Sequence, residues 1–180
     1  SGSWSPANGI AGRDAGLEPH WDEITSPDQV QIYEMVLGDV EGATTQVLER
    51  AAILLKDNRL PPRGFSSQHP AYDTVQVGPM AALDADFNRR NGSEGSGADR
   101  LVYRVSTGDQ SSMVHATARL HYQAVPKRWV DAMFGFSDQS ERIAAFESMY
   151  EAADRTPVLV AEARSTGWPG FDPDAIDWKM

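Results

Sequence analysis

The sequence predicts a mainly β protein with long irregular loops and one clear α-helix. Short segments rich in β-branched and aromatic residues recur along the chain, and clusters of Gly, Pro, Asn and Asp separate them. The clearest helical stripe of apolar residues runs through residues 137–153. With 180 residues, the chain is long enough for one domain with its own hydrophobic core.

The N-terminal part begins without a regular pattern. Residues 1–28 are rich in Gly, Pro, Asp and Ser and predict an irregular arm, which we expect to continue from an upstream part missing from this sequence. Gln29–Leu37 predicts a strand, and the turn residues Gly38–Gly42 end it. Thr44–Asn58 has helical spacing of its apolar residues, but its opening Thr-Thr-Gln-Val suits a strand after a hairpin turn, so both interpretations stay open.

The middle of the chain is rich in turns. Residues 64–99 contain one predicted short strand, Thr74–Val77, and a Gly-rich and Ser-rich loop at residues 91–97. Arg100–Ser106 and Ser112–Ala124 alternate in the manner of two paired strands, and Gly108-Asp109 lies between them.

The C-terminal part holds the predicted helices. Pro126–Phe136 predicts a short helix or turn, and Ser137–Ala153 predicts the one long helix because its apolar residues recur on one face. Val158–Ala163 predicts a strand, and residues 165–180 form a tail with prolines and aspartates.

Composition excludes several classes of function. The net charge of −10 argues against nucleic acid as a partner, because phosphate contacts need clustered Lys and Arg. The absence of cysteine excludes disulfides, thiol catalysis and covalent attachment of haem c to this chain. No apolar run approaches the roughly 20 residues that span a bilayer, so no membrane span is expected.

Three segments together resemble a known family. They are Glu18–Glu34 (EPHWDEITSPDQVQIYE), Leu54–Phe65 (LLKDNRLPPRGF), and Asp99–Val105 (DRLVYRV) with Ala118–Gln123 (ARLHYQ). They look like the C-terminal, haem-free region of bacterial exported multihaem c-type cytochromes, over most of the chain from about Ser1 to Ala163. The first two segments are the more specific, and the Cys-x-x-Cys-His motifs of that family are absent here.

The resemblance implies a fold, a location and partners. It implies an antiparallel β-sandwich domain at residues 29–164, in a protein of the bacterial periplasm or cell exterior. Haem c would belong to a companion chain or to a missing upstream segment, which would be this chain's first partner. A redox partner protein would be the second. An acidic surface suits salt-sensitive docking to a basic electron-transfer protein.

Histidines are the first candidate ligands. The resemblance makes His20 a candidate axial ligand for the haem iron of another chain, with Asp22 orienting its second nitrogen. The alternative is a structural histidine that fixes a loop. His115 and His121 lie six residues apart in a predicted strand, so they share one face at about 20 Å from each other and predict a surface or interface role.

An acidic loop is the second candidate site. Its alternating oxygen ligands are typical of a calcium loop: Asp84, Asp86 and Asn88. Arg89 stands where an EF-hand needs Gly, so we expect at most a simpler calcium site, completed by Glu94 or Asp99. A solvated acidic loop is the alternative. Nearby, Asp57 and Arg59 predict a structural corner before Pro61-Pro62.

Tryptophans predict a third kind of site. Exposed Trp rings stack on sugars, so Trp21 and Trp168, together with Trp4 and Trp178, are candidate carbohydrate-binding residues. The alternative is that these rings anchor loops to the core.

The sequence therefore favours a non-catalytic β-sandwich domain or subunit of a multihaem cytochrome electron-transfer system. Its expected work is to cover haems, exclude water and dock partners. A carbohydrate-binding module and an accessory subunit that binds calcium or haem iron are the alternatives. No phosphate loop, Gly-x-Ser-x-Gly elbow or His-Glu-x-x-His motif predicts an enzyme.

Overall fold

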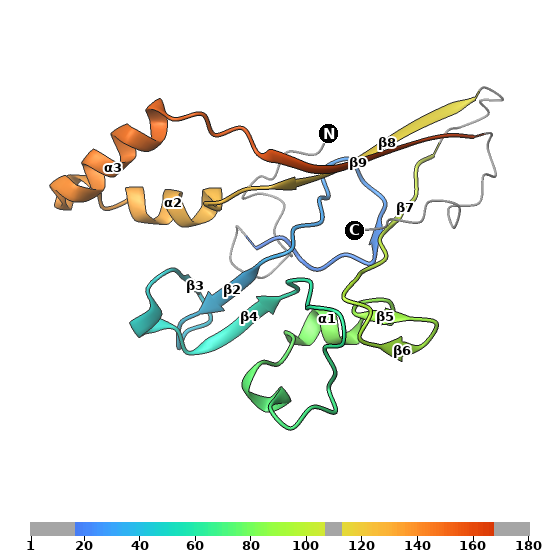
Figure 1. Ribbon diagram of the computed structural model, residues 1–180. Helices are drawn as coiled ribbons and strands as arrows, with labels where there is room; N and C mark the ends of the chain where they lie inside the picture. The colour runs from blue at the N-terminus through green and yellow to red at the C-terminus, as the bar shows by residue number, and fades with distance from the viewer. Residues whose placement is uncertain (1–16, 107–112, 168–180) are drawn as a thin grey trace. The chain divides into compact units, whose positions relative to one another are not determined.

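The computed structural model describes residues 17–106 and 113–167 and divides the chain into two compact units (Figure 1). The first unit is Ser1–Val105 and the second is Ser106–Met180. The predicted arm at residues 1–28 lies partly outside the described residues, and the tail at 165–180 lies mostly outside them. The domain boundaries predicted at residues 28 and 164 stay predictions.

A three-stranded antiparallel sheet forms the centre of the first unit, with the order β3-β2-β4. Its strands are β2 (Met35–Gly38), β3 (Thr44–Thr45) and β4 (Ile53–Asp57). The turn after β2 forms because the side chain of Asp39 accepts hydrogen bonds from the amides of Glu41 and Ala43. This turn sets the register in which Leu37 faces Thr45.

The structure settles the open interpretation of residues 44–58 in favour of strands. A short 3₁₀ turn, Leu48–Arg50, separates β3 from β4. The helical spacing of the apolar residues is outweighed by pairing of β4 along β2. Only the last part of the strand predicted at Gln29–Leu37 forms, because the preceding residues are bent around the polar groups described below.

Three small elements complete the first unit. β1 (Glu23–Ile24) pairs in parallel with β7 (Val102–Tyr103), and β5 (Arg89–Arg90) forms a tight hairpin with β6 (Ser93–Glu94). α1 (Pro79–Leu83) starts directly after Gly78, which lies against the end of β4. A Cβ atom on Gly78 would come within 2.4 Å of the Asp57 backbone nitrogen, so only glycine permits this approach.

Two predictions about strands are wrong. Thr74–Val77 is not a strand, because the chain forms a 3₁₀ turn at Tyr72–Thr74 instead. The strand at Arg100–Ser106 does not pair with the strand at Ser112–Ala124: β7 pairs with β1, far away in the sequence. Local alternation indicates that a segment is extended but does not identify its partner.

The second unit is a long antiparallel ribbon that continues into two helices. β8 (Val114–Tyr122) pairs with β9 (Val158–Gly167), with an irregularity in register between Leu120 and His121. α2 (Lys127–Phe134) and α3 (Glu141–Ala152) connect the two strands, with a 3₁₀ turn at Ser137–Gln139 between them. Both helices lie beyond one end of the ribbon (Figure 1).

The helices of this unit are held together by aromatic rings. Phe134 from α2 packs against Phe146 and Tyr150 of α3 at ring-centre distances of 5.9 and 5.5 Å. The helix predicted at Ser137–Ala153 is confirmed for Glu141–Ala152, while Ser137–Gln139 form the separate 3₁₀ turn. Phe146 and Tyr150 of its apolar stripe make contacts, but Met149 is 69% exposed. The short helix or turn predicted at Pro126–Phe136 is a helix.

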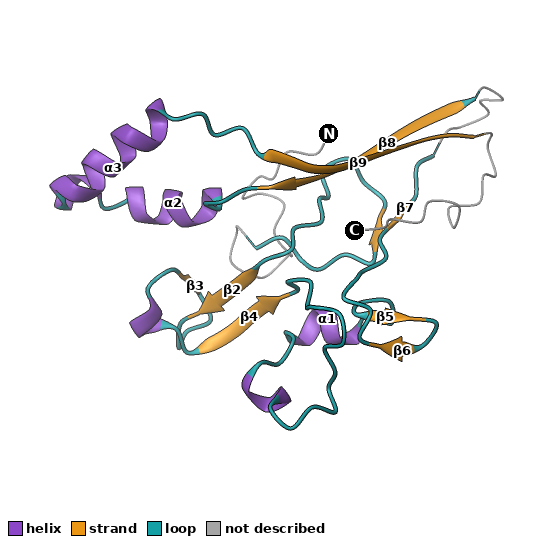
Figure 2. Cartoon of the chain, in the orientation of Figure 1, coloured by secondary structure: helices purple, strands orange, loops and turns teal. Residues whose placement is uncertain are grey.

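The described residues as a whole form a mixed structure (Figure 2). The prediction of a mainly β chain with one long helix is confirmed only in part, since several short helices accompany small, separate sheets that do not make a clear sandwich. Among the residues that the structure describes, no helix has both the length and the apolar character needed to cross a bilayer.

Candidate functional site

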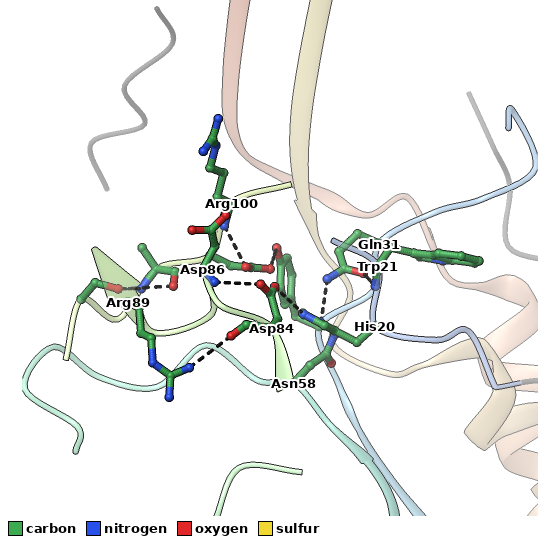
Figure 3. Close-up of polar contacts among 12 residues, drawn as sticks. His20, Trp21, Gln31, Asn58, Asp84, Asp86, Arg89 and Arg100 are labelled. Atoms are coloured by element: carbon green, nitrogen blue, oxygen red, sulfur yellow. Dashed lines mark hydrogen bonds and ion pairs between the residues drawn. The ribbon is translucent and has the colours of Figure 1, made fainter. Parts of the chain in front are cut away.

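A buried polar cluster around His20 is the candidate site of the first unit (Figure 3). The His20 side chain is almost fully buried, and Nε2 lies 3.0 Å from Oδ2 of Asp84. Nδ1 lies 3.0 Å from the amide nitrogen of Gln31 and 3.1 Å from that of Asn58. The imidazole and Phe87 rings pack nearly perpendicular to each other with a ring-centre distance of 5.3 Å. Both ring nitrogens are therefore in use.

Backbone groups fix how the two amide side chains are oriented. The Gln31 amide oxygen accepts a hydrogen bond from the Trp21 backbone amide at 2.9 Å, so its NH₂ group faces His20. The Asn58 amide oxygen accepts from the Glu34 backbone amide at 2.8 Å, and its NH₂ group also donates to the Ile32 carbonyl at 2.9 Å. Rotating either amide by 180° would set donor against donor.

These orientations determine the tautomer of His20. Two N–H donors, from Gln31 and Asn58, point at Nδ1, so Nδ1 must offer its lone pair. The imidazole proton then lies on Nε2 and is donated to Asp84. His20 is thus a neutral histidine fixed by three partners from three separate parts of the chain.

Asp84 is positioned by the short helix α1 and the loop that follows it. Its Oδ1 accepts a hydrogen bond from the Asp86 backbone amide at 2.8 Å, which leaves Oδ2 for His20. Arg89 donates from Nη1 to the Asp84 carbonyl oxygen at 3.1 Å and so fixes the same loop from its other end. Since Gly78 holds the start of α1 against β4, the sequence from Gly78 to Arg89 determines where this carboxylate lies.

Asp99 is the second carboxylate of the cluster. Tyr33 donates its hydroxyl to Oδ2 at 2.8 Å, and the Arg100 backbone amide donates to Oδ1 at 2.8 Å. Burial raises the pKa of Asp99, and the nearby charge of Asp84 adds to the increase, while the hydrogen bond from Tyr33 opposes it. Burial and the charge of Asp99 in turn raise the pKa of Tyr33.

His20, Asp84 and Asp99 bring their ligand atoms within 4.8 Å of one another, which is the spacing of a metal site. The donor chemistry does not fit one. A metal at Nε2 needs the imidazole proton on Nδ1, where it would face the two N–H donors of Gln31 and Asn58. The same argument applies to haem iron. The prediction that His20 ligates a haem in another chain therefore requires this whole arrangement to open.

The three predicted calcium ligands, Asp84, Asp86 and Asn88, do not share a common partner in the structure. Asp84 bonds to His20, as above, and Asp86 is exposed. Asn88 is buried, with its amide oxygen accepting from the Gly97 backbone amide at 3.0 Å and its amide nitrogen donating to the Phe65 carbonyl at 2.9 Å. Asn88 thus fastens two loops to each other, in a left-handed backbone conformation with φ of 56°.

Trp21 is the one candidate sugar-binding residue that lies among the described residues; Trp168, Trp4 and Trp178 lie outside them. Its indole nitrogen donates to Oε1 of Glu18 at 2.9 Å, and the Val30 backbone amide donates to the same oxygen at 3.2 Å. Glu18 is only 1% exposed. Trp21 therefore anchors its loop through a buried carboxylate.

Two smaller predictions can also be placed. The corner at Asp57 and Arg59 is confirmed, since Arg59 donates from Nε and Nη2 to the two carboxylate oxygens at 2.9 and 2.7 Å. This pairing raises the pKa of Arg59. His115 and His121 are both exposed on β8. They are six residues apart, so they lie on the same side of the strand.

The sequence points to His20 and Asp84 but not to the other two polar partners of His20, Gln31 and Asn58. Tyr33, the partner of Asp99, is not predicted either. Gln31 and Asn58 are polar residues within or beside apolar segments. A polar residue in an apolar segment is the sequence feature that could have indicated these partners, because such a side chain is buried only with a hydrogen-bond partner. Asp99 was considered only as a calcium ligand.

A scan of protein-family models, a search of curated proteins and a search of solved structures each gave no match.

Proposed function

We propose that this chain is a non-catalytic domain or subunit of an exported multihaem c-type cytochrome system, where it covers haems and docks partner proteins. With no cysteine, the chain itself carries no covalent haem c. In this proposal the haem belongs to a companion chain or upstream segment, and the assembly works in the periplasm or outside the cell.

One observation carries the proposal. The segments on which the family resemblance depends are far apart in the sequence, yet they supply His20 and several of the residues around it in the polar cluster, while Asp84 comes from outside them (Figure 3). Glu18–Glu34 provides His20, Gln31 and Tyr33, Leu54–Phe65 provides Asn58, and Asp99–Val105 provides Asp99. Residues that resemble the family are thus residues that hold a fold together, which supports a shared structural domain.

The chemistry of the cluster supports the non-catalytic part of the proposal. A general base needs a lone pair that faces a substrate, and the Nδ1 lone pair of His20 faces two amide donors. The proton on Nε2 is directed at Asp84. An imidazole used in this way orders three chain segments and offers no atom to a reacting molecule.

The net charge supports the docking part. With 26 acidic against 16 basic side chains, the chain attracts a basic electron-transfer partner at low ionic strength. We expect about 0.3 M salt to slow such docking, because screening weakens electrostatic steering. An association rate that does not change with salt would contradict this part.

The direct experiment is to isolate the tagged chain from its natural source and record the visible spectrum of the purified material. A Soret band, together with a companion band that stains for haem on a denaturing gel, is the expected result. An untagged strain processed in the same way is the control. A colourless preparation that contains only a species of 19.7 kDa would contradict the proposal.

A further inference from the structure

The β5–β6 hairpin reverses direction at an Asn-Gly pair (Figure 1). Arg90 faces Ser93 in the register, so Asn91 and Gly92 alone form the turn. Their φ angles are 51° and 77°, as in a two-residue type I′ turn, which needs positive φ at both positions. Asn and Gly are the residues that adopt this left-handed backbone most readily. The fold therefore explains why this pair occurs here.

The same pair is chemically reactive. The backbone nitrogen that follows an Asn can attack the Asn side chain, and glycine hinders this attack least because it has no side chain beside its nitrogen. A bond forms between the Gly92 nitrogen and Cγ of Asn91, and the bond from Cγ to the side-chain nitrogen breaks. Ammonia leaves with the proton that the Gly92 nitrogen gives up. Water then opens the five-membered succinimide ring at either carbonyl, which yields aspartate or isoaspartate.

Both reacting groups are accessible in the structure. Asn91 and Gly92 are exposed, and a Cβ atom on Gly92 would meet nothing within 4 Å. Among the residues that the structure describes, no hydrogen bond holds the Asn91 side chain or the Gly92 backbone nitrogen. The turn is closed by strands of only two residues each, so little structure must open before the backbone rotates into the geometry of attack.

The other asparagines provide a comparison within the same chain. Asn58 and Asn88 are each followed by Arg, and both are buried. Backbone groups hold the oxygen and the nitrogen of each side-chain amide. Asn8 is also followed by glycine but lies outside the described residues. Asn58 and Asn88 are therefore internal controls for Asn91.

We propose that Asn91 is a site of spontaneous deamidation and isoaspartate formation. Aspartate at this position keeps the turn, because Asp also tolerates the left-handed conformation. Isoaspartate breaks the turn, because the main chain then runs through the side-chain carbons and gains one atom, whereas the type I′ geometry closes with two ordinary residues. The two products therefore differ in their effect on the hairpin, although they have the same charge.

The hairpin also supports the cluster around His20. Its register sets Arg89 opposite Glu94, and the two side chains lie 3.6 Å apart. Arg89 also donates to the Asp84 carbonyl oxygen at 3.1 Å, and the Asp84 carboxylate lies 3.0 Å from Nε2 of His20. Isoaspartate at residue 91 therefore loosens the loop that positions Asp84 and lowers the stability of the first unit.

The test is incubation of the full chain in mildly alkaline buffer, followed by peptide mapping with chromatography and mass spectrometry. The expected result is conversion of Asn91 to aspartate and isoaspartate while Asn58 and Asn88 stay intact. Isoaspartate forms only through the ring, so its presence distinguishes attack by Gly92 from direct hydrolysis. The same chain unfolded in urea shows how fast the free segment reacts. An Asn91 that stays intact while the unfolded chain is converted, or that yields aspartate alone, overturns the proposal.

A second measurement separates the two products by their effect on stability. The aged chain carries Asn8→Gln, so that the other Asn-Gly pair does not contribute. Its isoaspartate form, purified by ion-exchange chromatography, should unfold at a lower urea concentration than the unaged chain. Asn91→Asp in the same background is the matched control and should unfold like the unaged chain. Equal midpoints for the isoaspartate form and Asn91→Asp would refute the link from the hairpin to the cluster.

Discussion

Replacing Asn58 with Asp changes one NH₂ group into an oxygen and alters nothing else in size or shape. Asn58 is 0% exposed and sits at the end of β4, where its NH₂ group donates to Nδ1 of His20 and to the Ile32 carbonyl. In Asn58→Asp, an ionised oxygen would face two acceptors. The variant therefore tests whether the donors and acceptors of the cluster are arranged as they are in the structure.

The expected cost follows from the number of hydrogen bonds lost. Asn58→Asp removes two buried hydrogen bonds, although the Ile32 carbonyl keeps Lys56 as a donor and Nδ1 of His20 keeps Gln31. The two lost bonds cost about 1–3 kcal/mol in total, and a buried oxygen that faces two acceptors costs about 1–3 kcal/mol more, so the variant should lose about 2–6 kcal/mol of unfolding free energy. That is a large share of the roughly 5–15 kcal/mol that stabilises a typical domain.

Urea unfolding followed by circular dichroism measures this loss, provided that the slope of free energy against urea stays unchanged between variants. Asn91→Asp is the control, because it makes the same chemical change at an exposed turn position and should stay within about 0.5 kcal/mol of the parent chain. If Asn58→Asp were within about 1 kcal/mol of the parent, the assigned orientation of the cluster would be wrong.

Two further substitutions test neighbouring parts of the account. Burial and the charge of Asp84 raise the pKa of Asp99 above its ordinary 3.8, so the folded chain holds this proton more tightly than the unfolded chain, and this contribution to stability is lost as pH rises through the raised pKa. Asp99→Asn should flatten that part of the pH dependence of urea unfolding as pH rises above about 4; a dependence equal to that of the parent chain would contradict the assignment. Gly78→Ala should lower the thermal midpoint sharply, because its Cβ would lie 2.4 Å from the Asp57 backbone nitrogen. Gly135→Ala should change the midpoint little, because its Cβ would lie 3.5 Å from the Ala132 carbonyl oxygen, which is ordinary contact. Equal midpoints for the two alanine variants would show that α1 is not held against β4 as the structure has it.

Local patterns in the sequence were sufficient for elements whose contacts are close in the chain. The apolar residues of α2 and α3 predict their own helices, since Phe134, Phe146 and Tyr150 lie where the two helices meet. Strand β9 is also recognisable from its run of β-branched residues.

Pairing between distant segments was not predictable from local patterns. β1 joins β7 in parallel, with almost 80 residues between the strands. Alternation reports that a strand is half-buried, but the identity of its neighbour depends on the rest of the fold. The wrong partner predicted for Arg100–Ser106 has this cause, and so does the prediction of one sandwich where the described residues form small, separate sheets.

The candidate site was likewise predictable from the sequence only in part. His20 could be singled out from its residue type and its place beside Trp21, but its role could not. That role depends on Asn58 and Asp84, which are 38 and 64 residues away in the sequence. A histidine surrounded by donors is a fixed neutral junction, and one with a free lone pair is a ligand or a base. Only the arrangement of the amides separates these cases.

The most direct test of the central claim, that His20 is a fixed structural junction, is nitrogen NMR of its imidazole in the full chain at neutral pH. Chemical shifts and couplings distinguish a protonated ring nitrogen from one that accepts a hydrogen bond. The account predicts a proton on Nε2, an unprotonated Nδ1, and no change when Zn²⁺ or Ca²⁺ is added. A proton on Nδ1, or a shift of Nε2 on addition of metal, would contradict it.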